Sequence, residues 1–335
     1  MNAHQLHQQA LVLDAHNDSL CLKLAEGDPP DFGPSNEAYQ VDLPRMKQAG
    51  LTAFLSYVGA RELPTSLELW DAVHWHLETY PDDFTLARNA ADIRRAKTEH
   101  RIAFIGQLES CACLHQSLRV LSLQHRLGLR VANLTHGEGQ ATHEHSLQVD
   151  SSPFDYTDAA AREAARKEMK GLTGFGRDLI AACNDMGLVV DTAHANDATF
   201  YEAIEASRKP CIFSHGCVFA LCPHWRGLTD DQIKALAERG GVMGVAFYRN
   251  FIHPEDPTLG RLMDQVEHVI NLVGPDHIGF GSDFDGLPEG SIPIPAHMGV
   301  LEEFTEGLIG RGFDEATILK ILGGNFLRVI EEVCG

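Results

Sequence analysis

The sequence has few basic residues for its length. Of its 335 residues, 27 are Lys or Arg and 47 are Asp or Glu, so the formal net charge is -20 at pH 7 with histidine neutral. Nucleic acids and anionic membrane surfaces are bound through basic faces. The charge therefore argues against either as a partner, and it favours the attraction of cations.

Long apolar runs are also lacking. No stretch approaches the roughly 18 uninterrupted apolar residues of a membrane-spanning helix, and residues 1–7 do not begin a basic segment followed by an apolar one. The eight cysteines lack the paired spacing of a zinc knuckle, although Cys111-x-Cys113 and Cys217-(x4)-Cys222 lie close together. We therefore expect a cytoplasmic protein with no membrane segment and with free thiols.

Internal repeats, low-complexity tracts and Gly/Ser linkers are absent, so nothing in the sequence marks a domain boundary. The composition, with 44% hydrophobic and 22% charged residues, is typical of a globular enzyme with a substantial core. We expect a single domain over residues 1–335, with longer loops at about 19–50 and 137–171. These loops are either lids over an active site or surface excursions without a role.

What the sequence does contain is a repeated alternation of two kinds of segment. Short apolar, β-branched runs predict strands at 11–16, 51–58, 102–108, 129–135, 188–193, 211–214, 242–248 and 277–282. Helical periodicity predicts helices at 87–97, 159–170, 173–186, 198–207, 230–239, 261–273, 313–321 and 326–333. Eight strands alternating with helices predict an α/β fold of the (β/α)8 TIM-barrel type. No Gly-x-Gly-x-x-Gly loop follows the first strand, which argues against a dinucleotide-binding sheet.

The first predicted strand ends in His16-Asn17-Asp18. Because successive side chains of a strand point to opposite faces, His16 and Asp18 are expected to point the same way. An imidazole and a carboxylate held side by side suit a divalent metal of the zinc type. Taken alone, the motif is more often an ordinary strand end than a metal site.

Other strands end in polar residues too, and the C-terminal ends of the strands form the active-site face of a barrel of this type. The residues at these ends are His16, Asp18, Glu109, His136, His194, His215, Tyr248 and Asp283. Three histidines and three carboxylates suffice for two divalent ions that share a bridging carboxylate and a hydroxide nucleophile.

Each of these residues has an expected role. We assign His16, Asp18 and Glu109 to one ion. We assign His194 and His215 to the other, with Glu109 as the bridge. Asp283 is expected to orient the attacking water, accept its proton and pass the proton to the leaving group.

Six motifs of the chain resemble those of the renal (membrane) dipeptidase family, zinc peptidases of family M19 among the amidohydrolase-like barrels. The motifs are Asp14-Ala15-His16-Asn17-Asp18, Gly171-Leu172-Thr173-x-Phe175-Gly176, Val190-Asp191-Thr192-Ala193-His194, Ser214-His215, Gly281-Ser282-Asp283-Phe284-Asp285-Gly286 and Gly323-Gly324-Asn325-Phe326-Leu327-Arg328-Val329. The resemblance runs from about residue 10 to residue 331. It implies a distorted (β/α)8 barrel with two zinc ions, a glutamate bridge and a homodimer.

The same resemblance implies roles around the substrate. His136 would stabilise the oxyanion of the tetrahedral intermediate. Arg226 and Tyr248 would bind the C-terminal carboxylate of the substrate, since a guanidinium pairs with a carboxylate through two hydrogen bonds. The expected function is therefore a metal-dependent dipeptidase, whose substrates include dipeptides with D-configured C-terminal residues.

The chain departs from the family pattern at positions around the substrate. The departures are Ser110-Cys111 after Glu109 in place of Gly-Gly, Gly216 after His215 in place of Ser, and Gly227 after Arg226 in place of Asn. Two alternatives therefore stay open. One is a related amidohydrolase acting on an N-acyl amino acid, a cyclic imide or a lactone, and the other is a barrel that binds ligands without chemistry.

Several ionisable residues are expected to be structural. Asp14 is expected to hydrogen-bond behind the metal ligands, and Asp285 to shape the turn after the eighth strand. Asp191 faces away from His194 if strand alternation continues to that residue. Histidines that follow no strand-end pattern, such as His76, are expected at the surface.

Overall fold

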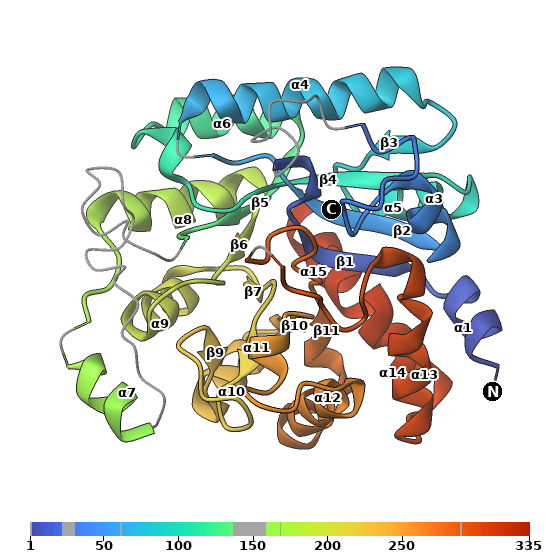
Figure 1. The fold of residues 1–335 in the computed structure, drawn as a ribbon. Coiled ribbons are helices and arrows are strands. Elements are labelled where there is room, and N and C mark those ends of the chain that lie inside the picture. Colours follow the sequence, from blue (N-terminus) through green and yellow to red (C-terminus); the bar gives the residue numbers. More distant parts are fainter. Residues whose placement is uncertain (1, 22–30, 61, 137–158, 168, 289) are drawn as a thin grey trace.

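The computed structural model describes residues 2–21, 31–60, 62–136, 159–167, 169–288 and 290–335. Eight parallel strands, paired in the order β1-β2-β4-β5-β6-β7-β10-β11, surround the centre of the molecule (Figure 1). They are β1 (Val12–Asn17), β2 (Leu51–Tyr57), β4 (Ile102–Leu108), β5 (Leu129–Asn133), β6 (Val189–Asp191), β7 (Ile212–Phe213), β10 (Val242–Val245) and β11 (Ile278–Phe280). All eight predicted strands, and the predicted α/β barrel, are confirmed.

The barrel is nearly closed between its first and last strands. Asn17 forms an isolated parallel bridge with Phe284, just after β11. The Asp18 amide donates to the Phe284 carbonyl at 3.0 Å, and the Asp283 amide donates to the His16 carbonyl at 3.2 Å. Closure thus brings the two ends of the sheet together at the residues singled out in the sequence.

Three short strands were not predicted. β3 (Phe84–Leu86) pairs with the first half of β4, whose second half pairs with β5. β8 (Cys217–Val218) and β9 (Gly227–Leu228) form a separate two-stranded sheet. Segments of two or three residues carry too little periodicity to be read from the sequence.

Helices cover the outside of the barrel (Figure 1). They are α1 (Ala3–Gln9), α3 (Leu43–Gln48), α4 (Leu63–Thr79), α5 (Ala90–Thr98), α6 (Leu118–Leu127), α7 (Ala159–Arg166), α8 (Gly174–Met186), α9 (Asp197–Ala206), α10 (Asp230–Glu238), α11 (Arg249–Ile252), α12 (Leu259–Val273), α13 (Glu302–Gly310), α14 (Glu315–Leu319) and α15 (Asn325–Cys334). The eight predicted helices correspond to α5, α7, α8, α9, α10, α12, α14 and α15. Many of them begin at a side-chain cap, as α10 does at the capping box of Thr229 and Gln232.

The prediction that His76 lies at the surface is wrong, and the helix that carries it, α4, was not identified in the sequence. His76 on this helix is fully buried, not at the surface. Its Nε2 accepts a hydrogen bond from the Phe32 amide at 3.1 Å, and its Nδ1 lies 2.7 Å from the Ala72 carbonyl oxygen. A histidine with both ring nitrogens partnered can be buried at little cost.

The motif Gly323-Gly324-Asn325 joins the C-terminal helix to the barrel. A Cβ atom on Gly323 would lie 2.3 Å from the carbonyl oxygen of Leu11, so only glycine permits this close approach to β1. The Asn325 side-chain amide donates to the carbonyls of Pro275 and Ile278 at 2.8 and 2.7 Å. Helix α15 then packs its apolar face, including Phe326 and Val329, against the inward-facing residues of the strands.

The two long loops predicted at 19–50 and 137–171 fall partly outside the described residues. Within them the structure describes α3 and α7. None of the helices in the described part of the chain combines the length and the apolar character needed to cross a membrane.

Candidate metal centre

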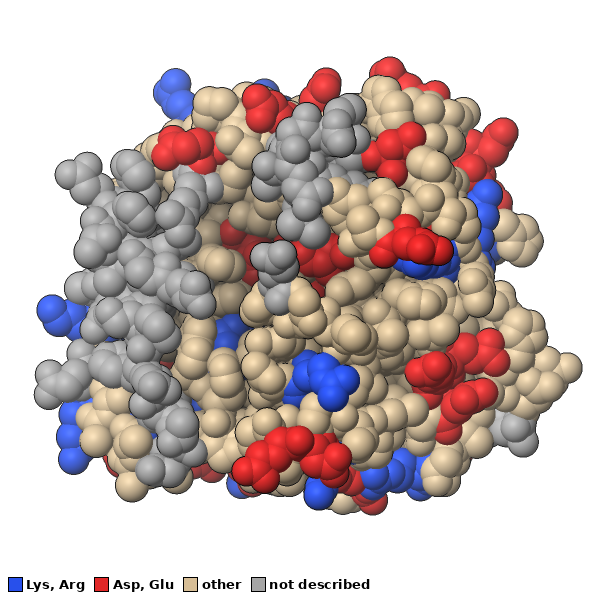
Figure 2. Space-filling model, in the orientation of Figure 1, with Lys and Arg blue, Asp and Glu red and all other residues tan. Residues whose placement is uncertain are grey.

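The ionisable side chains predicted at the strand ends meet at one mouth of the barrel. In the described part of the chain, three groups have ligand atoms within 4.8 Å of one another: His16 with Glu109 and His215, Glu109 with His136 and His194, and His16 with Asp18 and Asp283. None of these groups includes a cysteine, and all eight cysteines are free thiols, as predicted. Figure 2 shows a hollow in this face of the molecule in which acidic side chains are visible.

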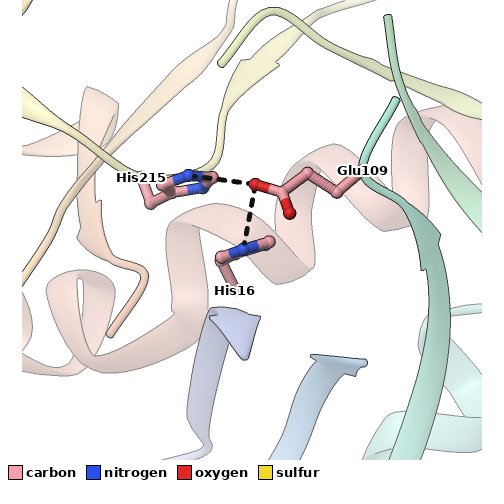
Figure 3. Close-up of side chains that lie close together, drawn as sticks. All are labelled: His16, Glu109 and His215. Carbon is pink, nitrogen blue, oxygen red and sulfur yellow. Dashed lines mark ion pairs between the residues drawn. The ribbon is translucent and has the colours of Figure 1, made fainter. Parts of the chain in front are cut away.

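Glu109 lies at the centre of the cluster. Its Oε1 lies 2.9 Å from His194 Nε2, 3.4 Å from His16 Nε2 and 3.6 Å from His215 Nε2. Figure 3 shows this oxygen beside the rings of His16 and His215, with a dashed line to each. The other oxygen, Oε2, lies 3.8 Å from His136 Nε2. One oxygen of Glu109 therefore faces histidines assigned to both ions, and the other oxygen faces His136, which is assigned to neither.

The distances between the ligand atoms suit a small divalent ion. Two ligands of a tetrahedral zinc ion lie about 3.3 Å apart, because Zn–N and Zn–O bonds are about 2.0–2.2 Å long. The Nε2 atoms of His194 and His215 lie 3.1 Å apart, and His16 Nε2 lies 3.1 Å from Asp18 Oδ2. Asp283 Oδ1 is farther from His16 Nε2, at 4.0 Å. Asp283 therefore lies at the edge of the cluster.

The neutral state of His194 and His215 also suits a bound cation. Burial, with Arg226 and neighbouring histidines, holds the pKa of His194 and of His215 well below the usual range. Both rings are then neutral, with nitrogen atoms facing each other at hydrogen-bond distance. Burial also lowers the pKa of His16, but Asp18 and Glu109 outweigh it and raise that pKa well above the usual range. An imidazole nitrogen among carboxylates and neutral imidazoles is a donor set that zinc prefers.

Two carboxylates of the cluster, Glu109 and Asp283, have pKa values shifted in opposite directions. Burial raises the pKa of Glu109, but His16 and His136 hold it well below its usual range. Burial, together with Asp18, raises the pKa of Asp283 well above its usual range. Ionisable groups shifted in opposite directions in one cleft are typical of a functional site.

Left-handed backbone conformations place several of these residues. His194 and Asp283 have φ angles of 65° and 61°, and Ser110, directly after Glu109, has 72°. Such angles are uncommon for residues other than glycine and cluster at functional sites. The position of Ser110, where glycine is usual in the resembling family, therefore has a backbone conformation that favours glycine.

A second set of hydrogen bonds lies behind the ligands. Asp14, fully buried, accepts from the amide and the hydroxyl of Ser282 at 2.7 and 2.6 Å, in agreement with its expected structural role. Asp285, also as expected, fixes the turn after β11. It accepts from the Gln40 amide at 2.8 Å and from the Ser19 hydroxyl.

The sequence analysis missed Gln107, whereas Asp191, expected to be structural, is buried behind the ligands and belongs to none of the metal-binding groups. Gln107 Oε1 lies 2.8 Å from His16 Nδ1. Asp191 lies in the barrel interior, where it accepts a hydrogen bond from Gln107. β6 ends at Asp191, so strand alternation does not extend to His194. Gln107 lies on β4 two residues before Glu109, which directly follows the strand, and this spacing is the signal that could have identified it.

Tyr57 was also missed. It is the last residue of β2, the one strand to which the sequence analysis assigned no polar end residue. Burial raises the pKa of Tyr57 well above its usual range, and Cys21 and Glu109 contribute to the same shift. Its phenol therefore stays protonated.

Arg226 and Tyr248 both lie against the ring of Phe251, and Arg226 interacts electrostatically with Asp283 and Glu109 of the cluster. The Arg226 guanidinium carbon lies 5.7 Å from the centre of the Phe251 ring, and the Tyr248 ring lies 4.9 Å from it, edge to face. Arg226 is 5% exposed, and its Nη1 has no hydrogen-bond partner among the described residues. Burial lowers the pKa of Arg226, whereas Asp283 and Glu109 raise it. A buried guanidinium nitrogen without a partner is costly, and an anionic ligand would remove that cost.

Comparisons with known proteins identify dipeptidases as relatives of the chain. The profile of a family described as membrane dipeptidase (peptidase family M19) matches residues 1–334. Dipeptidase aclJ of Aspergillus oryzae is 31% identical over 326 residues, which cover 90% of this chain and 72% of that protein. Dipeptidase tcpJ of Claviceps purpurea is 31% identical over 350 residues, covering 96% and 76%.

Solved structures share the fold. A dipeptidase described as a metallopeptidase of family M19 is 25% identical with a TM-score of 0.84, and the match covers 97% of this chain and 99% of that one. A metallopeptidase of Rhodobacter sphaeroides, solved with a phosphinate mimic of the dipeptide L-Ala-D-Ala, is 23% identical with a TM-score of 0.83 over 97% and 99%.

Proposed function

The chain belongs to the membrane dipeptidase family, peptidase family M19, a family of metallo-dipeptidases; from this premise we propose that it hydrolyses dipeptides with a free carboxylate, using two zinc ions. The residues that would hold the ions are His16, Asp18, Glu109, His194 and His215. Their support is the spacing of the donor atoms and the neutral state of two of the imidazoles. Bound zinc would lower the pKa of water towards neutrality and polarise the scissile carbonyl.

Asp283 is the proposed proton carrier. Its carboxylate lies beside the cluster, 4.0 Å from His16 Nε2, and burial with Asp18 raises its pKa. A carboxylate with a raised pKa can take a proton from the attacking water at one oxygen atom and deliver it to the leaving amine nitrogen.

His136 is proposed to donate a hydrogen bond to the oxyanion of the tetrahedral intermediate. Its Nε2 lies 3.8 Å from Oε2 of Glu109, and its side chain is 41% exposed, so a substrate can reach it. Hydrogen bonds to charge that develops in the transition state lower the barrier directly.

The observation that carries the choice of substrate is the buried Arg226 guanidinium with an unpartnered Nη1 beside the metal cluster. A free substrate carboxylate would pair with it and fix the distance from the C-terminus to the scissile bond. Tyr248, whose ring also packs against Phe251, would add a hydrogen bond from its hydroxyl. The fold shared with a protein solved with an L-Ala-D-Ala mimic supports including D-configured C-terminal residues among the substrates.

The test is hydrolysis of a dipeptide panel by the protein loaded with two equivalents of zinc. The panel includes L-L and L-D dipeptides, their C-terminal amides, N-acetyl amino acids, a cyclic imide and a lactone. We expect cleavage of the free dipeptides and little cleavage of the amides. Cleavage of N-acyl amino acids, imides or lactones with no dipeptide cleaved would overturn the proposal in favour of a related amidohydrolase.

The Arg226→Met variant tests the role of the guanidinium. Loss of a charge-assisted hydrogen bond of about 1.5–3 kcal/mol should lower kcat/KM by roughly 10- to 150-fold, mainly through KM. Zinc content should not change. Arg249→Met, which replaces an exposed arginine nearby, is the matched control and should behave like the wild type.

A further inference from the structure

A fully buried carboxylate, that of Asp191, lies beneath the metal centre without contributing to it. Its Oδ1 accepts hydrogen bonds from the backbone amides of Ala193 and Ser214, both at 3.0 Å. These residues directly precede His194 and His215. One oxygen of Asp191 thus holds the two backbone segments that carry both histidines of the second proposed zinc ion.

The other oxygen of Asp191 is linked to His16. Asp191 Oδ2 accepts from Gln107 Nε2 at 2.9 Å and from Asn133 Nδ2 at 3.4 Å. Gln107 Oε1 in turn lies 2.8 Å from His16 Nδ1. A chain of two hydrogen bonds therefore joins Asp191 to the third histidine of the centre.

The chemistry of these groups fixes the direction of each bond. A carboxylate only accepts hydrogen bonds, so Gln107 must turn its NH2 group to Asp191 and its carbonyl oxygen to His16. That oxygen also only accepts, so His16 must carry a proton on Nδ1. Nε2, the atom that faces Asp18 and Glu109, is then the ring nitrogen whose proton a metal ion would displace.

We propose that Asp191 is a positioning residue that, through Gln107, holds His16 in the tautomer that binds metal and, through two backbone amides, orients His194 and His215. The inference rests on the proposed metal-dependent function. Partners behind a metal-bound histidine typically contribute 10- to 100-fold in metal affinity.

The Asp191→Asn variant should reverse the direction of the hydrogen bonds that join residue 191, Gln107 and His16. The asparagine oxygen is needed by the two backbone amides, so its NH2 group faces Gln107. The Gln107 amide then turns over and presents its NH2 group to His16 Nδ1, which moves the proton to Nε2. We expect zinc affinity, measured by competition with a chelator at fixed pH, to fall by about 10- to 100-fold.

The double variant Asp191→Asn with Gln107→Glu provides the decisive measurement. It exchanges the amide and the carboxylate along the chain and keeps the wild-type net charge. The asparagine NH2 group can donate to Glu at position 107, whose carboxylate accepts from His16 Nδ1 as before. We expect this variant to bind zinc at least fivefold more tightly than Asp191→Asn alone, a rescue that a purely structural role for Asp191 does not predict.

Controls separate this inference from the function beneath it. Asp42→Asn changes another fully buried carboxylate, which caps α3, and should leave zinc affinity unchanged. If Asp191→Asn does not fold, Gln107→Leu, which removes only the link to His16, should still weaken zinc binding by about tenfold or more. Wild-type affinity in either single variant, or no rescue in the double variant, overturns the inference. A wild-type protein that binds no zinc overturns the proposed function as well.

Discussion

Glu109 shows how much one residue can determine at the mouth of a barrel. Its Oε1 faces three imidazoles and its Oε2 faces a fourth. Removal of the Glu109 side chain would therefore take away a partner of all four histidines. Asp283 differs, because it lies at the edge of the cluster and has a raised pKa. The two carboxylates should therefore respond differently to substitution.

Asp283→Asn should retain zinc and lose turnover. Asparagine has nearly the shape of aspartate but cannot accept the proton of the attacking water, and general acid–base catalysis contributes about 10²–10⁴-fold. We expect kcat to fall by that factor with the zinc content unchanged, measured by steady-state kinetics and elemental analysis.

Glu109→Ala is the matched comparison and should lose both ions. A Glu109→Ala protein with full zinc content would contradict the bridging role. A loss of zinc from Asp283→Asn would show instead that Asp283 is a ligand.

At the scale of the residue, the sequence identified the ionisable groups at the strand ends but not those that support them. Gln107 and Tyr57 lie on strands of the barrel and could have been found by the same argument. The partner of Gln107 could not, because the contact with Asp191 joins residues 84 positions apart in the chain.

At the scale of the element, the ends of strands limited what alternation could predict. His194 and Asp283 lie beyond the last residues of β6 and β11 and have positive φ angles. Strand alternation does not apply to such residues, so it could not relate the direction of Asp191 to that of His194. The turn after each strand, not the strand itself, aims these two side chains.

Helix α1 provides a prediction about pH. His7, fully buried, joins this helix to the rest of the fold: its Nε2 lies 2.7 Å from the Ala49 carbonyl oxygen and its Nδ1 2.6 Å from the Thr305 hydroxyl. Burial lowers the pKa of His7 below its ordinary 6.5. Below about pH 6.5 the unfolded chain therefore binds more protons at this site than the folded protein, so stability is lost as the pH falls.

His7→Gln should remove this loss. Between pH 7 and pH 5.5 the free energy of unfolding of the wild type should fall more than that of the variant, by at most about 1.4 kcal/mol per pH unit. Urea unfolding of the metal-free proteins at both pH values measures the difference. His4→Gln, on the exposed side of the same helix, is the control, and an equal pH dependence in wild type and His7→Gln would refute the prediction.

At the scale of the whole molecule, the ions should stabilise the fold. The proposed ligands come from β1, β4, β6 and β7 or the residues just after them, so bound zinc would join segments spread over most of the sequence. A site that is filled at 100 times its Kd adds about 2.7 kcal/mol to stability, which raises the Tm of a chain of this size by roughly 3–8 °C. Thermal unfolding with and without a chelator measures the effect.

The Glu109→Ala protein provides the comparison for this experiment. Its Tm should not respond to zinc, since the shared ligand is missing. Identical melting temperatures for the wild type with and without zinc would contradict binding of metal to the folded state.

Other properties of the whole molecule remain predictions. The homodimer, the cytoplasmic location and the organisation of residues 1–335 as one domain follow from the sequence and from the resemblance to the family. The loops expected at 19–50 and 137–171, either as lids or as surface excursions, lie partly outside the described residues. Gel filtration with light scattering would determine the oligomeric state.

The sequence by itself determined the eight strands, most of the helices that follow them, and the ionisable residues at the strand ends. It could do so because hydrophobic periodicity is a local property, and because parallel strands of a barrel place their C-terminal ends at the same face. Among the described residues, it did not determine the helices α1, α3, α4, α6, α11 and α13 or the three short strands.

Tertiary structure alone decided how the site is supported. The chain from Asp191 through Gln107 to His16, the buried Arg226 beside Phe251, and the closure of β1 against the segment after β11 all join residues that are distant in sequence or lie in irregular turns. Hydrogen bonds and packing of this kind depend on the final positions of atoms, which local periodicity does not specify. The residues of the centre can therefore be read from the sequence, whereas the reason that they point at one another can be read only from the fold.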